Sequence, residues 1–124
     1  MKNLRVQSWG CEQEHLVQID LEQKGYRLLE KNWTCRWGEI DLIFECGLTD
    51  SRQSSEVELI FVEVRARRNQ SGPLPEEWMS QKKVQALRRS VQIYLASYRG
   101  PAGQVRMDLV TVVGGHIQHF PNWF

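Results

Sequence analysis

Apolar positions recur along the chain with two periods, one typical of helices and one typical of strands. Leu16, Val17 and Leu21 lie at helical spacing among good helix formers, and the pattern predicts a helix over residues 12–24 that ends at Gly25. A second helix is expected over residues 80–98, with Ser80 as its N-cap. The apolar stripe of this helix comprises Val84, Leu87, Val91, Tyr94 and Leu95.

Four β-prone stretches, at residues 26–34, 39–45, 57–64 and 105–113, predict strands, and the segments 47–56 and 69–75 predict loops. The short links favour an antiparallel meander of the first three strands, and the second helix allows a parallel crossover to the fourth. We therefore expect one α/β domain over residues 1–124, with helices packed on a mixed sheet. A short segment, 116–120, leads into an aromatic tail that packs either onto the core or against another subunit, so a homodimer is left open.

Composition supports this class, because 41% hydrophobic and 25% charged residues in a chain of 124 are typical of one globular domain. No apolar run reaches the roughly 18 residues that a membrane span needs. Residues 1–10 hold no signal-type apolar stretch, which favours a cytoplasmic protein without membrane association. Three cysteines, Cys11, Cys35 and Cys46, stand far apart and are expected to be free thiols.

Charge is distributed unevenly along the chain. Residues 1–62 hold seven Lys/Arg and eleven Asp/Glu, a formal charge of −4, whereas residues 63–124 hold nine and four, a charge of +5. An acidic half that holds metal beside a basic half that holds phosphate would show this pattern. A solvated surface with chance asymmetry would show it too.

The candidate chemistry lies on two of the expected strands. Side chains alternate along a strand, so Glu39 and Asp41 should share one face, while Ile40, Leu42 and Phe44 share the other. On the next strand Glu63 and Arg65 share a face in the same way. Three carboxylates that converge favour a cation such as Mg²⁺ or Mn²⁺. The alternative is a solvated sheet face on which Glu63 pairs with Arg65.

Several segments carry a resemblance to a known family. They are Lys24-Gly25-Tyr26-Arg27-Leu28-Leu29, Asn32-Trp33, Cys35-Arg36, Gly38-Glu39-Ile40-Asp41-Leu42-Ile43 and Phe61-Val62-Glu63-Val64-Arg65. In these segments the chain resembles the YraN-like family of uncharacterised bacterial proteins, from about residue 14 to residue 113. That family is similar to the PD-(D/E)XK nuclease superfamily, which includes Holliday-junction resolvases. The resemblance implies a restriction-endonuclease-like core.

The resemblance also implies roles for individual residues. Asp41, Glu63 and the backbone carbonyl of Val64 would bind Mg²⁺ or Mn²⁺, while Glu39 and the helix acid Glu14 would support the same site. Lys83 falls on a basic position from which it could reach a phosphate. Arg65 stands where the superfamily has lysine; it can stabilise charge on phosphate but cannot act as a base near neutral pH. The placing of Glu14 is less secure, because Gln13 replaces the usual preceding glycine.

Basic residues in the C-terminal half suggest contacts with nucleic acid, whose affinity is largely electrostatic. They are Arg67 and Arg68 after the third strand, and Lys82, Lys83, Arg88 and Arg89 on the second helix. An ordinary solvated face is the alternative. Trp33, Trp37 and Trp78 are candidates for base stacking, with a core role favoured for Trp33.

The leading expectation is a metal-dependent endonuclease that acts on DNA, including branched DNA, with Asp41, Glu63, Arg65, Glu39 and Glu14 in the active site. A nuclease-like domain that binds nucleic acid without cutting it is the second expectation, because arginine replaces the lysine. The third is a protein that keeps only the fold and binds a protein partner.

Overall fold

The computed structural model describes residues 4–47, 57–69, 79–100 and 103–124. Most of the two expected loops, and Trp78, lie outside these ranges. Within them, no helix is both long enough and apolar enough to cross a membrane.

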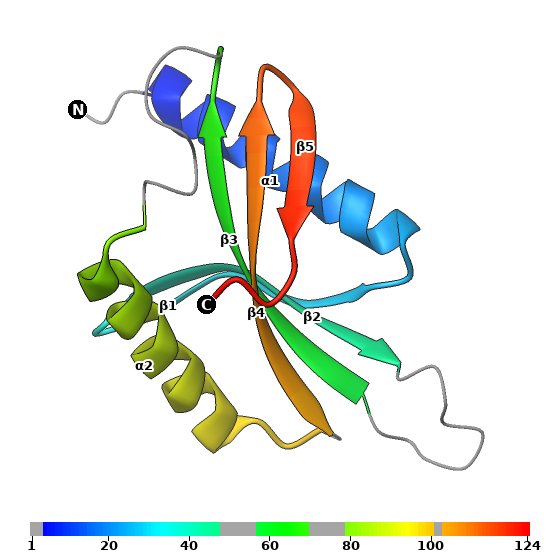
Figure 1. Ribbon diagram of the computed structural model, residues 1–124, viewed down its shortest axis with the longest axis vertical. Coiled ribbons are helices and arrows are strands. Elements are labelled where there is room, and N and C mark those ends of the chain that lie inside the picture. The colour runs from blue at the N-terminus through cyan, green and yellow to red at the C-terminus, as the bar shows by residue number, and fades with distance from the viewer. Residues whose placement is uncertain (1–3, 48–56, 70–78, 101–102) are drawn as a thin grey trace.

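A five-stranded mixed sheet forms the centre of the molecule (Figure 1). Its strands, in spatial as well as chain order, are β1 (Arg27–Cys35), β2 (Gly38–Gly47), β3 (Val57–Arg67), β4 (Gln104–Val113) and β5 (His116–Phe120). All neighbours are antiparallel except β3 and β4, which are parallel and are joined through helix α2 (Gln81–Ser97). The predicted meander, crossover and mixed sheet are therefore confirmed.

Helix α1 (Leu4–Gln23) begins well before the predicted start at residue 12. Gly10, a weak helix former, lies inside it and masked the extension in the sequence pattern. The helix ends at Gln23, just before the predicted stop signal Gly25, whose φ of 95° is accessible to glycine at little cost. At the start of α2, Ser80 accepts a 3.2 Å hydrogen bond from the backbone N–H of Lys83, which confirms the predicted N-cap.

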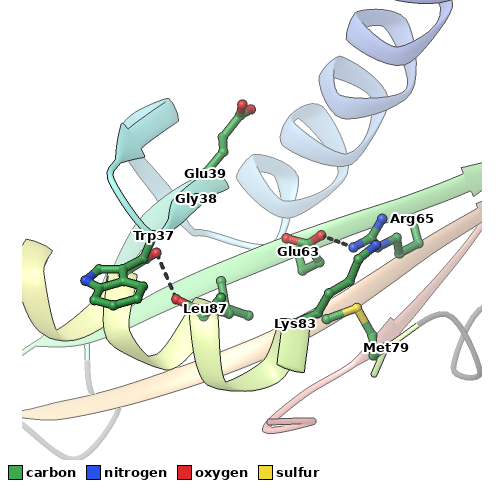
Figure 2. Close-up of a pocket in the computed structure, with 10 residues that line it drawn as sticks. Trp37, Gly38, Glu39, Glu63, Arg65, Met79, Lys83 and Leu87 are labelled. Carbon is green, nitrogen blue, oxygen red and sulfur yellow. Dashed lines mark hydrogen bonds and ion pairs between the residues drawn. The ribbon is translucent and has the colours of Figure 1, made fainter. Parts of the chain in front are cut away.

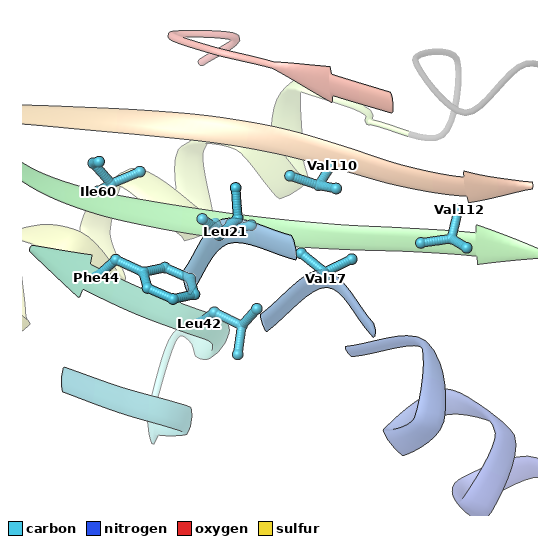
Figure 3. Packing of buried hydrophobic residues seen from close by; sticks show 8 residues of the cluster. Val17, Leu21, Leu42, Phe44, Ile60, Val110 and Val112 are labelled. Atoms are coloured by element: carbon cyan, nitrogen blue, oxygen red, sulfur yellow. The ribbon is translucent and has the colours of Figure 1, made fainter. Parts of the chain in front are cut away.

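Each helix covers one face of the sheet and buries its own apolar cluster. Val17 and Leu21 of α1 pack against Leu42, Phe44, Ile60, Val62, Val110 and Val112 (Figure 3). Leu87, Val91 and Tyr94 of α2 pack against Ile40, Ile43, Leu59 and Phe61, with Trp33 at the margin. Trp33 stands edge-on to Tyr94, so its expected core role is confirmed.

Strand β2 departs from the expected alternation of side chains. Ile40 was expected to share a face with Leu42 and Phe44, and this is wrong, because Ile40 packs in the α2 cluster and the other two pack in the α1 cluster. Pairing between β2 and β3 stops at Leu42 opposite Val62. Toward its N-terminal end β2 then turns away from β3 (Figure 1). The change of face falls between Ile40 and Leu42.

The C-terminal tail folds back onto its own chain. The backbone N–H of Phe124 donates to the carbonyl of Met107 at 3.4 Å, and the Phe124 ring packs beside the α2 cluster. Packing onto the core is thus shown for Phe124, and packing of the tail against another subunit stays a prediction. The three cysteines are free thiols, as expected.

A fully buried carboxylate, Asp108, anchors this C-terminal region. Its two oxygens accept 2.9 Å hydrogen bonds from Arg106, which also bonds Glu58 and the Tyr26 hydroxyl. His119 lies 2.6 Å from Asp108, and the Asn122 backbone N–H donates to it at 2.8 Å. The network ties β3, β4, β5 and the tail together; the sequence pattern gave no signal for it.

Candidate functional site

Four acidic side chains from three elements approach one another where β2 and β3 separate. Glu14 comes from α1, Glu39 and Asp41 come from β2, and Glu63 comes from β3. One carboxylate oxygen from each of Glu14, Glu39 and Asp41 lies within 4.8 Å of the others. The structure therefore brings the helix acid, whose placing from sequence was least secure, directly to Asp41.

The position of Asp41 follows from the divergence of the two strands. Its Oδ2 accepts a 2.8 Å hydrogen bond from the backbone N–H of Val64, beyond the last paired residues Leu42 and Val62. The carboxylate thus occupies the place that a backbone carbonyl would take in a continued ladder. Val64 meets Asp41 through its amide, and its side chain packs against the α1 cluster.

Crowding of negative charge perturbs this cluster. Burial raises the pKa of Asp41 to about 8, with further increases from the charges of Glu63, Glu14 and Glu39, while the Val64 hydrogen bond opposes them. Burial and the charge of Glu39 also raise the pKa of Glu14. Like charges held together in a partly dry site repel one another unless a cation or a proton joins them.

Asn32 belongs to this site, although sequence reasoning assigned it no role. It adopts a left-handed backbone conformation, with φ of 52°, in the middle of β1. With its amide nitrogen turned toward the acids, it donates to Oε2 of Glu14 at 2.9 Å and to Oε1 of Glu39 at 2.8 Å. An asparagine inside a predicted strand was the available signal, because asparagine is depleted in strands and tolerates positive φ.

Glu63 and Arg65 form an ion pair on β3, with 2.8 Å between the guanidinium Nη2 and the carboxylate Oε1. Glu63 lies outside the trio whose oxygens approach within 4.8 Å, but its charge raises the pKa of Asp41. Burial raises the pKa of Glu63, while the charges of Arg65 and Lys83 oppose that increase. The buried Nε of Arg65 has no hydrogen-bond partner within the described part of the chain. A buried donor left without a partner costs stability.

Two pockets flank Arg65. One, of about 220 Å³, lies between the β1–β2 hairpin and α2 and is lined by Trp37, Glu39, Glu63, Arg65 and Lys83, among others (Figure 2). The other, of about 330 Å³, lies on the α1 side and is lined by Trp9, Glu14 and Arg65 with their neighbours. In Figure 2 the Lys83 side chain extends from α2 toward Glu63 and Arg65. The acidic cluster therefore has open space and a cation on either side.

The remaining basic residues are spread around these pockets. Arg89 lies over the ring of Trp37 at 4.4 Å, and Arg68 lies over the ring of Trp9 at 4.6 Å. Arg67 is partly buried on β3, whereas Lys82 and Arg88 are exposed on α2 and line neither pocket. Of the predicted basic residues, Arg65 and Lys83 are thus the two in direct reach of the acids.

The donor set fits a hard divalent cation. Glu14, Glu39 and Asp41 offer carboxylate oxygens from two separate elements, with Glu63 close by, and oxygen ligands of this kind are those that Mg²⁺ and Mn²⁺ prefer. No sulfur or imidazole ligand belongs to the group that the described residues form. A cation there would relieve the repulsion that raises the pKa of Asp41.

Comparison with known proteins identifies the family of this chain. The model of the "Uncharacterised protein family UPF0102" matches residues 13–112. A UPF0102 protein of Thermotoga neapolitana is 38% identical over 81% of this chain and 82% of its own. One of Persephonella marina is 35% identical over 94% and 95%, and one of Nocardia farcinica is 35% identical over 86% and 77%. The matched region contains α1 from Gln13 onward, the sheet up to Val112, and therefore every acid of the cluster. The chain belongs to the UPF0102, or YraN-like, family.

Proposed function

We propose that this protein is a metal-dependent endonuclease that cleaves DNA, including branched DNA, at the acidic cluster. The observation that carries the proposal is the convergence of Glu14, Glu39 and Asp41 within 4.8 Å of one another, beside a pocket that Arg65 and Lys83 line. The acidic cluster can bind the divalent cation, and the cationic side chains beside it can bind the phosphodiester anion.

Each residue has a role that follows from its position. Asp41, held by the Val64 amide, is the central ligand, with Glu14 and Glu39 as its companions. Asn32 fixes the orientation of the two glutamates. A bound Mg²⁺ or Mn²⁺ would neutralise the carboxylates, polarise a phosphoryl oxygen and lower the pKa of a water molecule.

The cations act on the phosphate. Arg65 and Lys83 both line the pocket beside the acids, where their positive charges would stabilise the negative charge that develops on the phosphoryl oxygens. Glu63 holds Arg65 in place through their ion pair. Arg65 stands where the nuclease superfamily has lysine, but Lys83 brings a lysine ammonium to the same pocket from α2. The replacement of lysine by arginine therefore leaves the site with both kinds of cation.

A cleavage assay tests the proposal. Purified protein is incubated with Mn²⁺ or Mg²⁺ and end-labelled linear or four-way-junction DNA, with Asp41→Asn and a chelator as controls. Cleavage by the wild type that both controls abolish is the expected result. Equal cleavage by wild type and Asp41→Asn would mean a contaminating nuclease and would contradict the proposed site.

The second candidate is a DNA-binding domain that does not cut, and the Glu63–Arg65 ion pair favours it, because the pair occupies an acid that would otherwise be free to bind metal. DNA binding that weakens with salt, without cleavage under any metal condition, would favour this candidate. Absence of both binding and cleavage would leave a protein partner as the function.

A further inference from the structure

The pocket between the β1–β2 hairpin and α2 has walls of two different kinds. Apolar groups of Trp37, Met79, Ala86 and Leu87 form one part of its lining. Charged groups form the other part, namely Glu39, Glu63, Arg65 and Lys83. Figure 2 shows Trp37 and Leu87 at one end and Lys83, Arg65 and Glu63 at the other. A ligand that fills this space can therefore place an apolar body against the first part and an anionic end beside Arg65 and Lys83.

Trp37 lies at the outer end of the pocket. It lies at the tip of the hairpin between Cys35 and Gly38, where an indole 38% exposed is not needed to fill a core. The guanidinium of Arg89 lies 4.4 Å from the ring centroid, and that of Arg36 lies 5.1 Å from it. These two cation–π contacts restrict the indole and place positive charge around it. Neither arginine pairs with a carboxylate of the described residues, so both remain able to contact phosphate.

The size of the pocket limits its occupant. A volume of about 220 Å³ is below the roughly 300 Å³ at which pockets for drug-sized molecules begin, and it suits a single ring system with a short extension. A base within a duplex is stacked on both faces and paired at its edge, so it cannot enter such a pocket. An unpaired base can turn out of the strand and pack against an aromatic side chain.

We propose that this pocket binds one unpaired nucleotide next to the scissile phosphate, with the base against Trp37, Ala86 and Leu87 and its phosphate toward Arg65 and Lys83. The inference rests on the proposed nuclease function and specifies its substrate class as DNA with an unpaired nucleotide beside a duplex. Trp37 then selects the substrate, whereas the acidic cluster performs the cleavage. Linear, fully paired DNA can make the phosphate contacts, but none of its bases enters the pocket.

A binding experiment in which two DNA duplexes differ by one base measures the contribution of that base to affinity. A short duplex carries one unpaired thymine, and a matched duplex carries an abasic residue at that position. Binding of both to Asp41→Asn protein is measured by fluorescence anisotropy without divalent metal, so that cleavage does not intervene. We expect the thymine duplex to bind roughly tenfold more tightly, the size of one base–aromatic stacking contact.

Variants connect this preference to the pocket. In the same background, Trp37→Ala should remove the difference between the two duplexes, and Trp37→Phe should keep most of it. Ala86→Leu should reduce the difference by filling the pocket from α2, which gives an independent check if Trp37→Ala unfolds. Trp123→Ala is the matched control, because Trp123 is 40% exposed and does not line the pocket.

The outcomes separate the two proposals. Salt-dependent binding that is equal for the thymine and abasic duplexes would overturn the nucleotide pocket and leave the nuclease proposal intact. A thymine preference that survives both Trp37→Ala and Ala86→Leu would also overturn the pocket. No binding to any DNA at low salt would overturn the nucleotide pocket and the proposed nuclease function together.

Discussion

The backbone N–H of Val64 donates a 2.8 Å hydrogen bond to Oδ2 of Asp41 across the point where β2 and β3 separate. This contact makes the central acid of the site part of the sheet itself. The same divergence that frees the Val64 amide from the ladder opens the space in which Glu14 and Glu39 approach Asp41. The geometry of the acids thus depends on the divergence of β2 and β3.

Divalent metal should stabilise the folded protein. Because the converging carboxylates exist only in the native state, Mg²⁺ or Mn²⁺ should raise the melting temperature in a concentration-dependent manner. Asp41→Asn should abolish this response, and Glu14→Gln should weaken it. Differential scanning fluorimetry measures the effect, with Glu12→Gln as the control because Glu12 is exposed on α1 and outside the cluster. A full metal response in Asp41→Asn would remove this site from consideration.

Without metal, the protein should lose stability as the pH rises. The pKa of Asp41 is about 8 in the folded protein, whereas the ordinary pKa of an aspartate is about 4. Between these two pH values the folded state holds a proton that the unfolded chain has released, so rising pH favours unfolding. Asp41→Asn removes the charge and should be more stable than wild type at pH 8 but not at pH 4.5. Urea unfolding in the presence of a chelator measures both. A variant that is less stable than wild type at pH 8 would contradict the prediction.

Arg65 should matter through its charge and its donors. Arg65→Ala removes the guanidinium from the pocket and leaves Glu63 without its partner, and cleavage should fall by about a hundredfold, as for loss of one donor to a transition-state anion. Arg65→Lys keeps a positive charge beside Glu63 and should retain or improve cleavage. The ratio of kcat/KM values is the measurement. Wild-type activity in Arg65→Ala would show that this position takes no part in the chemistry.

Salt should weaken DNA binding in proportion to the cations engaged. Three or four contacts from Arg65, Lys83, Arg89 and Arg36 would give a slope of roughly −3 for log affinity against log salt on duplex DNA. Replacing Lys82, Lys83, Arg88 and Arg89 by Gln should flatten the slope without unfolding the domain, because these side chains are exposed on α2. Arg99→Gln, just beyond α2, serves as a control of equal charge type. Binding that ignores salt would point to a protein partner instead.

The buried Asp108 should be a major determinant of stability. Asp108→Ala leaves Arg106 and His119 without their shared partner, and the expected loss is roughly 3 kcal/mol, as for breaking a buried ion pair. Asp20→Asn, in an exposed i,i+4 pair with Lys24, should cost less than about 0.5 kcal/mol.

The same network should fail in acid. Hydrogen bonds from His119, Arg106 and Asn122 hold the pKa of Asp108 below its usual range despite burial. Its contribution is therefore present above about pH 4 and lost as the pH falls through the lowered pKa. Denaturant unfolding of wild type and Asp108→Ala should show a difference that shrinks in acid. A difference independent of pH would indicate a packing defect alone.

The order of elements up to β4, the mixed sheet and most of the buried stripe on α2 could be predicted from sequence, because periodicity is a local property that reports which side of an element is buried. Strand β5 was expected only as a short tail segment. The acids Glu39, Asp41 and Glu63 were found by the same alternation. The alternation fails at Ile40, because the bend that moves it to the other face arises from the divergence of two strands and not from the local pattern.

Long-range geometry decided the rest. Glu14 lies beside Asp41 because of the angle at which α1 crosses the sheet. Asn32 reaches Glu14 and Glu39 because its backbone adopts the left-handed conformation. Arg89 lies over Trp37 because α2 packs beside the hairpin tip, and His119 meets Asp108 because β5 returns along β4. Contacts between residues far apart in the chain depend on strand twist, helix crossing angle and strand register. These are set when the elements pack together, and no periodic pattern in the sequence predicts them.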